Sequence, residues 1–488
     1  MTERVSRRRL IQGAAATAAA AVVVAFDPTT RSWATEAGRH AVPVPPLDGS
    51  LTMDPAARRE AADDYGHIVH RLPIAVLRPG SVNDVVVMVR YARAQRLKIA
   101  MRGQGHVCFG QAQVEAGIVI DSRTLNAVHA VLRDRAVVGP GATWGELLRA
   151  TAPLGLTPPV LTDYMGLSVG GTLSSGGIGG ASLHNGVQVD TVHELQVVTG
   201  RGELVSCSRW RNRELFDVVL AGLGQYAIIV RATVGLVPAD TGARVYNLFY
   251  GDLGTYLADQ LLLLRDGRFS YLEGQVQPRQ DGTPGWRYMI EAVSYFTPPA
   301  VPDDAALLAG LSDDRAAATI TPNTYLGWAF RLDPAVEYLK AIGDWYRPHP
   351  LLDLFVPASR AATVVGNALA TLTPADIGIG PILLFPASTA RFTRPLFRVP
   401  DEPDVFLFSL LRTTANSDPA LLASQLASNR ALYDSNFAAG GTWYPIGAIA
   451  DYDRADWRRH YGRQWNRVTS AKRSYDPDTV LTPGQRMF

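Results

Sequence analysis

His106 stands in a run of glycines that has the composition of a ligand-binding loop. Residues 101–111 read Met-Arg-Gly-Gln-Gly-His-Val-Cys-Phe-Gly-Gln. Glycine lets a backbone approach a bulky anionic ligand closely and adopt dihedral angles that are closed to other residues. Arg102 would add positive charge, and His106 would offer an uncrowded imidazole ring. The alternative is a tight turn that contains a hydrogen-bonded histidine.

A second glycine-rich segment, residues 161–180, holds seven glycines among serines and threonines. Such a segment can present backbone N–H groups and hydroxyls to phosphate oxygens. It has no lysine and so does not match a P-loop, and no helical pattern follows the glycines at 103–110, which argues against a Rossmann turn. A flexible loop or a crowded strand bend is the alternative. Two such segments favour a ligand that is held from two sides.

The elements around these segments predict a mixed α+β chain. Apolar runs at residues 97–101 and 117–121 predict strands on either side of the first loop. Ser81 is a candidate helix N-cap, with Asp84 three residues later and an apolar stripe beyond it at Val85, Val86, Val89 and Tyr91. Further expected elements are a hairpin that joins 195–198 to 203–205, a helix over 212–222 and a strand over 227–237.

The composition is that of a globular protein with more than one domain. A chain of 488 residues is too long for one hydrophobic core, so two domains are expected. The formal net charge of +2 gives no reason to expect nucleic acid as a partner. Two cysteines, Cys108 and Cys207, are too few for a disulfide scaffold, and because no metal-ligand spacing occurs, no metal is expected.

The N-terminus predicts export. Arg7 and Arg8 precede an alanine- and valine-rich run that ends near Phe26. Twin arginines before a modest apolar stretch are typical of a Tat signal peptide, which we assign to residues 1–34. The run is shorter than the ~20 apolar residues that a membrane span needs, so no stable membrane anchor is expected. A basic anchoring helix is the alternative. We expect a secreted or periplasmic protein.

Both glycine-rich segments resemble the PCMH-type flavin-binding domain of the vanillyl-alcohol oxidase superfamily, and the chain resembles the cytokinin dehydrogenases more closely. The resemblance continues through residues 192–204 and 222–226 and into the substrate half, which separates the subfamilies, at 348–357, 380–386, 475–477 and 483–488. It implies an α+β fold in which a two-lobed PCMH-type FAD-binding domain is followed by a substrate domain. The substrate domain would be an antiparallel sheet flanked by helices.

The expected domain order combines the resemblance with the composition. The signal peptide (1–34) would lead through a linker and an N-terminal helix (35–68) into the FAD-binding domain (69–239). A cytokinin-binding-like substrate domain (240–468) would follow, and a tail (469–488) would return to the FAD-binding domain.

The resemblance implies FAD as the cofactor, attached covalently through His106. Berberine-bridge-type oxidases tether the flavin a second time through a cysteine, and no cysteine stands at the matching place near Asp163, so one covalent bond is expected. The same match implies that further positions contact FAD: Arg102, Gly103, Gln104, Gly105, Gln111, Asp163, Ser168, Gly171, Thr172, Ser174, Gly179, Ile229, Trp443 and Gln485.

Asp163 is the implied catalytic base. In the resembling enzymes the matching aspartate takes a hydrogen bond from the side-chain amine of an N6-substituted adenine. Such a group works best if its surroundings raise its pKa toward the working pH. The alternative is that Asp163 caps the following segment. Glu291, in the apolar run 288–295, is implied to lie near the substrate entrance, and a surface or salt-bridged role is its alternative.

The implied activity is that of an FAD-dependent dehydrogenase. It would oxidise the side-chain amine of cytokinin-like N6-alkyladenines to an imine, which water cleaves to adenine and an aldehyde, with a quinone or oxygen as electron acceptor. Val107, Phe392 and Tyr444 depart from the family pattern of Ser, Trp and Leu, which could shift the substrate. A PCMH-type oxidase of an alcohol or sugar and a flavin-binding protein without turnover remain alternatives.

Overall fold

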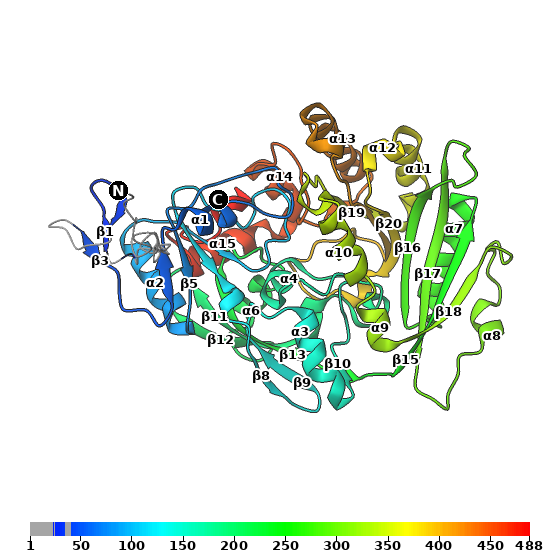
Figure 1. Cartoon of the computed structure of the whole chain (residues 1–488), viewed down its shortest axis with the longest axis horizontal. Coiled ribbons are helices and arrows are strands. Elements are labelled where there is room, and N and C mark those ends of the chain that lie inside the picture. The colour runs from blue at the N-terminus through cyan, green and yellow to red at the C-terminus, as the bar shows by residue number, and fades with distance from the viewer. Residues whose placement is uncertain (1–22, 24, 35–40) are drawn as a thin grey trace, which may run out of the picture.

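The structure is a computed structural model that describes residues 23, 25–34 and 41–488 (Figure 1). The twin arginines and most of the apolar run of the predicted signal peptide lie outside these residues. Two lobes lie side by side, one built on two sheets and the other on a single large sheet (Figure 1). We call them the first lobe and the second lobe.

A four-stranded sheet in the first lobe has the order β4-β5-β7-β6. Strands β5 (Ala75–Arg78), β7 (Ile118–Asp121) and β6 (Ile99–Arg102) are parallel, and β4 (Ser50–Thr52) is an antiparallel edge strand. All four residues of β7 are buried, as expected for a parallel strand that is covered on both faces.

Two helices cover the two faces of this sheet. Val76, Ala100 and Val119 pack on α1 (Pro55–Ala61), while the residues that alternate with them along the strands pack on α2 (Val82–Ala94). This alternation is the period of two that every strand imposes on its side chains. Arg102, two residues after Ala100, therefore lies on the α1 side of the sheet.

Helix α2 begins where the sequence predicts. The Ser81 hydroxyl accepts a hydrogen bond from the Asp84 N–H at 3.4 Å, and the predicted apolar stripe is buried. The carboxylate of Asp84 accepts the N–H groups of Asp48, Gly49 and Gly80, each at 2.8 Å. It thereby ties the incoming chain to the start of the helix.

The second sheet of the first lobe is antiparallel, with the order β12-β11-β13-β9-β8. The predicted hairpin is β11 (Val192–Thr199) with β12 (Leu204–Ser208), and the predicted strand is β13 (Ala227–Gly235). The predicted helix is α6 (Arg213–Val219). The remaining elements are β8 (Val128–Val131), β9 (Arg135–Val138), α3 (Trp144–Thr151), α5 (Ser182–Asn185) and the short pair β10 (Leu156–Thr157) with β14 (Val237–Pro238).

Helix α4 (Val169–Ser175) was not predicted, because its segment was expected to be a glycine-rich loop. Two glycines and two serines among seven residues have low helix propensity. Tertiary packing overrides that propensity, since Val169 and Leu173 are fully buried and the Trp144 indole N–H donates to the Thr172 hydroxyl at 2.7 Å.

The second lobe is built on one eight-stranded antiparallel sheet, as predicted. Its order is β18-β15-β17-β16-β20-β21-β19-β22. The strands are β15 (Gly242–Tyr250), β16 (Tyr271–Pro278), β17 (Trp286–Phe296), β18 (Thr319–Thr324), β19 (Leu352–Pro357), β20 (Ile382–Ser388), β21 (Asp404–Leu410) and β22 (Thr442–Trp443).

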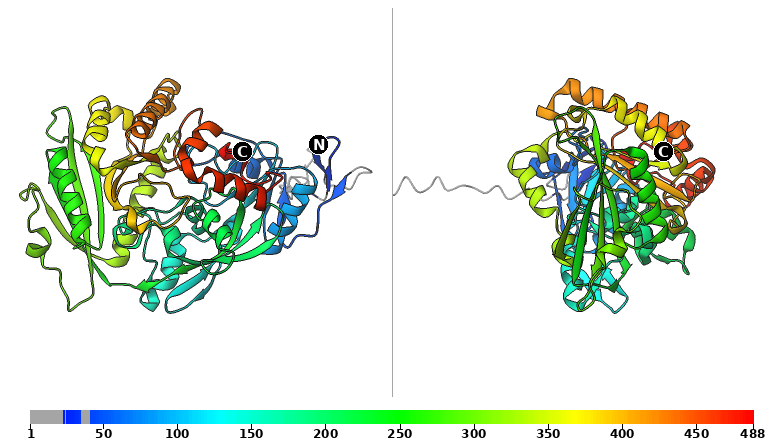
Figure 2. Two further views of the ribbon diagram at one scale, coloured as in Figure 1. Left: turned by 180° about the vertical axis from the view of Figure 1, so that it is seen from behind. Right: turned by 90° about the vertical axis from the view of Figure 1, so that its right-hand side faces the viewer.

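Helices flank this sheet. Those that pack on it or against one another at its edge are α7 (Leu253–Asp266), α11 (Ala361–Thr371) and α13 (Pro419–Ala438) (Figure 2). Along β16, a Cβ on Gly274 would meet the Tyr256 hydroxyl of α7, whereas the neighbouring Tyr271 and Glu273 point toward the first lobe. The remaining helices are α8 (Asp304–Leu308), α9 (Tyr325–Ala329), α10 (Asp333–Ala341) and α12 (Pro374–Ile377).

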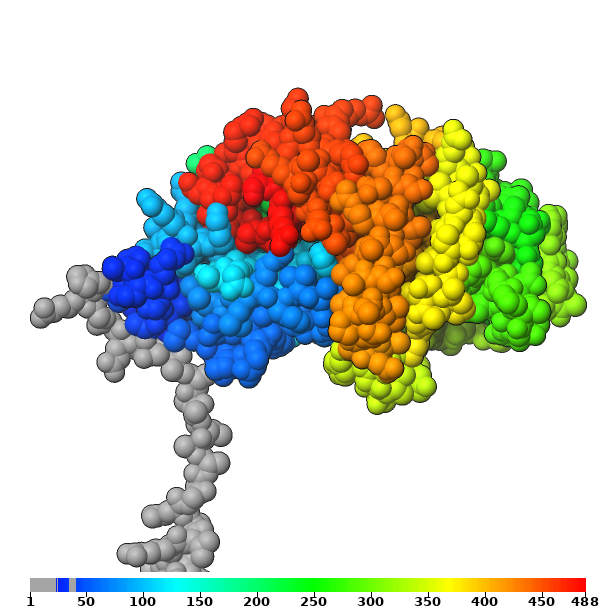
Figure 3. All heavy atoms as spheres, turned by 90° about the horizontal axis from the view of Figure 1, so that it is seen from above, coloured from blue at the N-terminus to red at the C-terminus, as the bar shows by residue number. Residues whose placement is uncertain are grey.

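The chain returns to the first lobe earlier than the predicted boundary at residue 468. Helix α14 (Arg454–Tyr461) lies next to the tail, where the Trp457 indole N–H donates to the Gln485 carbonyl at 2.8 Å. Helix α15 (Trp465–Tyr475) contacts α6. Seen from above, these C-terminal residues (red) cover the first lobe (blue and cyan) in Figure 3.

The first lobe also begins earlier than the predicted residue 69. Strand β4 already belongs to its sheet. Before it, β1 (Ala25–Asp27), β2 (Ser32–Ala34) and β3 (Val42–Pro43) form a small sheet, in which the Trp33 ring stacks on Tyr91 of α2 at 5.9 Å. Within the described chain, no helix is long and apolar enough to cross a membrane. Cys108 and Cys207 are both buried free thiols.

A buried ion pair fixes the tail. Lys472 and Asp476 lie 2.7 Å apart, with 5% and 0% of their side chains exposed. Asp476 accepts the N–H groups of Val480 and Leu481, and the Lys472 ammonium donates to the Gln225 carbonyl at 2.9 Å. Removing one partner of such a pair leaves an uncompensated charge in the interior.

We therefore expect Asp476→Asn to lower the free energy of unfolding by about 3–5 kcal/mol. Urea unfolding followed by circular dichroism measures it. The matched control is Asp478→Asn, because Asp478 is 51% exposed and pairs with Arg93 at the surface, where such a pair contributes less than ~1 kcal/mol. Equal losses for the two variants would contradict this account of the tail.

Candidate functional site

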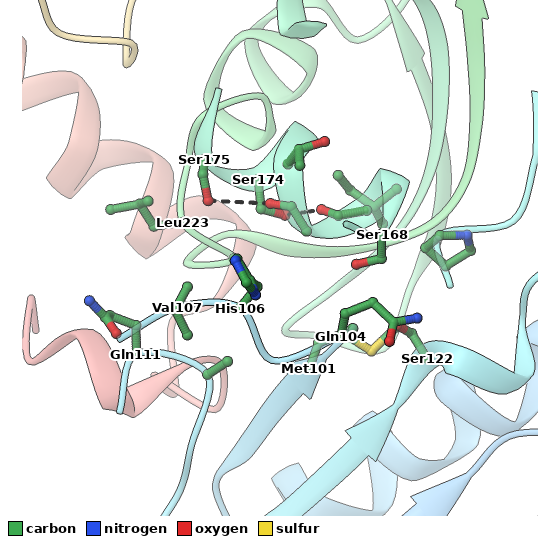
Figure 4. Close-up of a pocket in the computed structure, with 18 of the residues that line it drawn as sticks. Met101, Gln104, His106, Val107, Gln111, Ser122, Ser168, Ser174, Ser175 and Leu223 are labelled. Carbon is green, nitrogen blue, oxygen red and sulfur yellow. Dashed lines mark hydrogen bonds between the residues drawn. The ribbon is translucent and has the colours of Figure 1, made fainter. Parts of the chain in front are cut away.

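A cavity of the first lobe lies where the loop after β6 faces α4, the start of β13 and the C-terminal tail (Figure 4). It holds about 1080 Å³ of space, part of it open to solvent. Among the described residues, no charged side chain lines the cavity, and its polar groups are hydroxyls, amides, one imidazole and backbone.

Most of the predicted FAD-contacting residues line this cavity. They are Gly103, Gln104, Gly105, His106, Gln111, Ser168, Gly171, Thr172, Ser174, Ile229 and Gln485. Sequence reasoning missed others that line it, chiefly Met101, Val107, Ser122, Gly170, Ser175, Leu223, Gly224, Ala227, Ile228, Ile446 and Thr482. Many of these are sequence neighbours of predicted positions.

The glycines of the loop fit their places for steric reasons. A Cβ on Gly103 would lie 2.1 Å from the Ser168 hydroxyl, so this position of the loop packs closely against the Ser168 side chain at the start of α4. Gly105 has φ +70°, a left-handed conformation that favours glycine. The cradle that results has hydroxyls and backbone but no Cβ between them, which fits a phosphate-bearing ligand.

Arg102 does not contribute charge to the cavity, contrary to the prediction. Its guanidinium is buried and donates to the carbonyls of Glu60, at 2.8 Å, and Asp63. The cause is strand alternation, since Arg102 shares a face of β6 with Ala100 and points toward α1. Arg102 therefore fastens the loop to residues 60–63. The alternation of β6 is the sequence signal that could have shown this.

His106 is enclosed by aromatic rings. It projects from the loop toward α4 (Figure 4), and its ring stacks on Tyr65 with centroids 4.1 Å apart. The rings of Tyr164 and Trp345 lie 5.1 and 5.8 Å away. Tyr65 stacks in turn on His349 at 4.2 Å. Burial, with a smaller effect of His349, lowers the pKa of His106 to about 3. The imidazole is therefore neutral.

Asp64 holds the far end of the loop. Its carboxylate accepts the Gly110 N–H at 2.7 Å, the Gln113 side-chain amide at 3.1 Å and the Gly66 N–H at 3.1 Å. Burial raises the pKa of Asp64 to about 7, against the lowering effect of these hydrogen bonds and of Arg102.

Two more predicted contacts lie outside the cavity. A Cβ on Gly179 would lie 2.1 Å from the Leu161 carbonyl, so this glycine permits close packing of two protein segments. Trp443 is buried against Tyr452 and Trp457, and it lines a neighbouring recess that shares only Gln111 and Gln485 with the cavity.

Asp163 lies at the junction of the two lobes, bound to side chains of the second lobe. The Tyr271 hydroxyl donates to Asp163 Oδ1 at 2.5 Å, and Arg331 Nη2 donates to the same oxygen at 2.8 Å. No backbone N–H bonds to this carboxylate, and Ser168 is the N-cap residue of α4, so the helix-cap alternative is wrong.

The pKa values of Asp163 and the nearby Glu273 are shifted in opposite directions. Arg331, Tyr271 and Glu273 hold the pKa of Asp163 below its usual value, despite burial. Burial and the nearby Asp163 raise the pKa of Glu273 well above its usual range, so Glu273 keeps its proton and shares a hydrogen bond with Asp163. The expectation of a raised pKa for Asp163 is therefore wrong, because the opposite charge of Arg331 outweighs desolvation.

Glu291 takes the salt-bridged role that was its alternative. Its carboxylate lies 3.6 Å from Arg331 Nη2, and 14% of its side chain is exposed. It lines neither cavity of the site. Burial raises its pKa.

A second cavity adjoins Asp163 and is lined by both lobes. Asp163, Tyr271 and Arg331 form one wall. Other lining residues are Thr157, Thr162, Met165, His184, Asp240, Arg268, Tyr295, Tyr325 and Trp328. The Tyr164 ring contacts His106, while the preceding residue, Asp163, bonds to Arg331 on the wall of the second cavity.

Sequence reasoning missed Arg331, Glu273, Tyr271, Tyr65 and His349. A charged residue inside an apolar stretch was the available signal for Glu273 and Arg331, which stand in Tyr-Leu-Glu-Gly and Trp-Ala-Phe-Arg-Leu. Nothing in the sequence alone brings these stretches to Asp163.

Tyr444, which departs from the family pattern, forms a hydrogen bond with the second glycine-rich segment. Its hydroxyl accepts the Gly177 N–H at 3.0 Å. Its ring packs against Phe397 and Phe355, and Phe392 adjoins them, at centroid distances of 5.4–6.5 Å within the group. Tyr444 therefore belongs to an aromatic cluster with Phe355, Phe392 and Phe397.

Comparison with known families finds two matches that divide the chain. Residues 73–208 match the family described as FAD binding domain. Residues 288–488 match the family described as cytokinin dehydrogenase 1, FAD and cytokinin binding.

Similar proteins cover nearly the whole chain. ORF5 of the fasciation locus of Rhodococcoides fascians, named as an oxidoreductase, is 38% identical over 90% of this chain and 99% of its own length. Cytokinin dehydrogenase 1 of Oryza sativa is 35% identical over 90% and 92%, and cytokinin dehydrogenase 1 of Arabidopsis thaliana is 31% identical over 91% and 83%.

The fold is that of a VAO-type flavoprotein. The crystal structure of MtVAO615 from Myceliophthora thermophila superimposes with a TM-score of 0.69 at 19% identity, covering 84% of this chain and 79% of that one. This likeness confirms the predicted PCMH-type, two-domain α+β fold.

The raised pKa of Asp64 makes stability depend on pH. The pKa of the Asp64 carboxyl is about 7 in the folded chain, whereas the usual value for an aspartate is 3.8. Between these values the unfolded chain releases the proton and the folded chain keeps it. The contribution of Asp64 is therefore fully present below pH ~4 and is lost as the pH rises through 7.

We expect Asp64→Asn to flatten the fall of unfolding free energy between pH 4 and 7, where one such group contributes a slope of up to about 1.4 kcal/mol per pH unit. Urea unfolding at a series of pH values measures the slope. Asp134→Asn is the control, because Asp134 is 64% exposed, and it should keep the wild-type slope. Parallel curves for Asp64→Asn and the wild type would refute the assignment.

Proposed function

Because the chain belongs to the cytokinin dehydrogenase family, we propose that it oxidises the side-chain amine of cytokinin-like N6-alkyladenines. The FAD-dependent oxidoreductase activity is that of the family. The observation that carries the substrate proposal is the Asp163 carboxylate, which is held by the Tyr271 hydroxyl and Arg331 and whose sequence neighbour Tyr164 contacts the His106 ring.

The residues of the first cavity fit FAD. Its cradle of Gly103, Ser168 and Gly171 would take the pyrophosphate through neutral donors, and its apolar walls would take the ring systems. When bound, FAD supplies a hydride acceptor at its flavin ring. Because the lining residues that the structure describes carry no charge, binding would depend on backbone, hydroxyl and amide groups.

Asp163 acts on the substrate nitrogen. Its carboxylate accepts a hydrogen bond from the N6–H and then the proton itself, which frees the nitrogen lone pair as a hydride leaves the adjacent carbon. The substrate thus loses a hydride and a proton and becomes an imine. Water cleaves the C=N bond to adenine and an aldehyde. General-base catalysis of this kind contributes roughly 10²–10⁴-fold.

We propose a covalent bond between FAD and His106. The support is a ring that faces the cavity and is neutral, with a pKa of about 3, so a nitrogen lone pair is available. Stacking on Tyr65 limits the orientations of the ring. One covalent bond is proposed, since neither Cys108 nor Cys207 lines the cavity.

We also propose that a quinone or oxygen takes the electrons and that the protein is exported by the Tat route. The support for export is Arg7 and Arg8 ahead of the alanine- and valine-rich run. Replacing both arginines with lysine should leave the protein in the cytoplasm, and unchanged export would contradict this proposal.

Asp163→Ala should lower kcat for isopentenyladenine by roughly 10²–10⁴-fold, because the base is lost. The release of adenine measures the rate. Asp240→Ala is the matched control, since Asp240 lines the same second cavity but accepts from Thr297 at 2.8 Å, and it should leave the rate near that of the wild type. Near-normal turnover by Asp163→Ala would remove this carboxylate from the mechanism.

His106→Ala should lose covalently held flavin. After denaturing electrophoresis, the wild-type band should fluoresce and the variant band should not. His70→Ala is the control, because 58% of the His70 side chain is exposed and it pairs with Asp63 away from the cavity. A fluorescent His106→Ala band, or a wild-type band without fluorescence, would exclude the bond.

A further inference from the structure

Arg331 reaches Asp163 from the other lobe. It lies in the turn between α9 and α10, at the junction of the lobes (Figure 1). Its side chain is 17% exposed. Its guanidinium carbon stands 3.9 Å above the Trp328 ring, and this contact fixes the plane of the guanidinium.

One nitrogen of Arg331 lies within 4 Å of three carboxyl groups. Nη2 lies 2.8 Å from Asp163 Oδ1, 3.6 Å from Glu291 Oε1 and 3.7 Å from Glu273 Oε2. It also donates to the Tyr271 hydroxyl at 2.7 Å, and that hydroxyl donates to Asp163. Of the three carboxyl groups, Asp163 thus has the closest partners, the Tyr271 hydroxyl at 2.5 Å and Arg331 Nη2 at 2.8 Å.

The two glutamates have weaker support for a negative charge. Glu273 and Glu291 are directly opposite each other on β16 and β17, where like charges are destabilising. Glu273 Oε1 is buried without a hydrogen-bond partner. Arg331 Nη2 lies closer to Asp163 than to Glu273, so the geometry assigns the negative charge of this pair to Asp163 and the proton to Glu273.

We propose that Arg331 is a positioning residue for the oxidation, which holds Asp163 as the ionised base and directs the proton of the cluster to Glu273. This inference rests on the proposed function of Asp163. When the substrate nitrogen gives up its proton as the hydride leaves, Asp163 must be unprotonated to accept it. Without Arg331, Asp163 and Glu273 would compete for one proton, and the fraction of Asp163 ready to act would fall.

The titratable groups that face Asp163 come from three elements. They are Tyr271 and Glu273 of β16, Glu291 and Tyr295 of β17, and Arg331 of the α9–α10 turn, while His184, Asp240 and Arg268 line the adjoining cavity. Arg331 is the one cation in contact with the carboxylate in the described part of the chain. Its loss should therefore make the Asp163 proton harder to remove.

The test is the pH profile of kcat/KM for isopentenyladenine with Arg331→Gln and Arg331→Lys. In Arg331→Gln the acidic limb should move to higher pH by about 1–3 units, the amount by which a close opposite charge shifts a carboxyl. Arg331→Lys should restore part of the shift, since it keeps the charge but not the planar fork. At high pH the rate of both variants should approach that of the wild type.

Arg268→Gln is the matched control. Arg268 lines the same cavity but donates to the carbonyl groups of Leu307 and Ala309 and pairs with Asp266, so its acidic limb should not move. A folded, flavin-loaded Arg331→Gln enzyme with a wild-type acidic limb would overturn the proposal.

A second measurement does not depend on turnover. Asp163→Asn and Arg331→Gln should be non-additive in thermal unfolding, because each removes the partner of the other. Additive effects would also overturn the proposal. If the wild type oxidises no N6-alkyladenine, the proposed function fails, and the unfolding cycle still decides whether Arg331 and Asp163 are coupled.

Discussion

The site depends on keeping one carboxylate charged inside the protein. Desolvation alone would raise the pKa of Asp163, and Arg331, Glu273 and Tyr271 of the second lobe reverse this. The base therefore comes from one lobe and its counter-ion from the other. Because each lobe supplies one of these two groups, the site forms only where the flavin-type lobe meets the lobe that is built on the eight-stranded sheet.

The two cavities differ in the charges of their side chains. In the described part of the chain, the first is lined by no charged side chain, and burial keeps His106 neutral there. The second has Asp163, Arg331 and their partners on its wall. Tyr164 and Asp163 are adjacent in sequence and bring the two environments together. A ring that accepts a hydride and a base that accepts a proton need such different surroundings within one site.

The sequence predicts the local features and not the contacts that cross the lobes. The glycine spacing, the Ser81 cap and the period of two along β13 depend on near neighbours, so they are readable from the chain. Helix α4 was missed because buried Val169 and Leu173 outweigh its poor propensity. Arg331 was missed because its role depends on its contact with Asp163, which lies 168 residues earlier in the chain. Arg102 was misplaced because charge was considered without strand alternation.

The two-lobed site with its neutral imidazole and ionised base accounts for an amine dehydrogenase more directly than for a binder without turnover, since a binder needs no charged carboxylate at the lobe junction. The most direct measurement is anaerobic mixing of the purified yellow protein with isopentenyladenine, followed by flavin absorbance. We predict that the yellow band bleaches and that adenine appears. A band that persists with this amine but bleaches with an alcohol or a sugar, or a protein that remains colourless after reconstitution with FAD, would contradict the account.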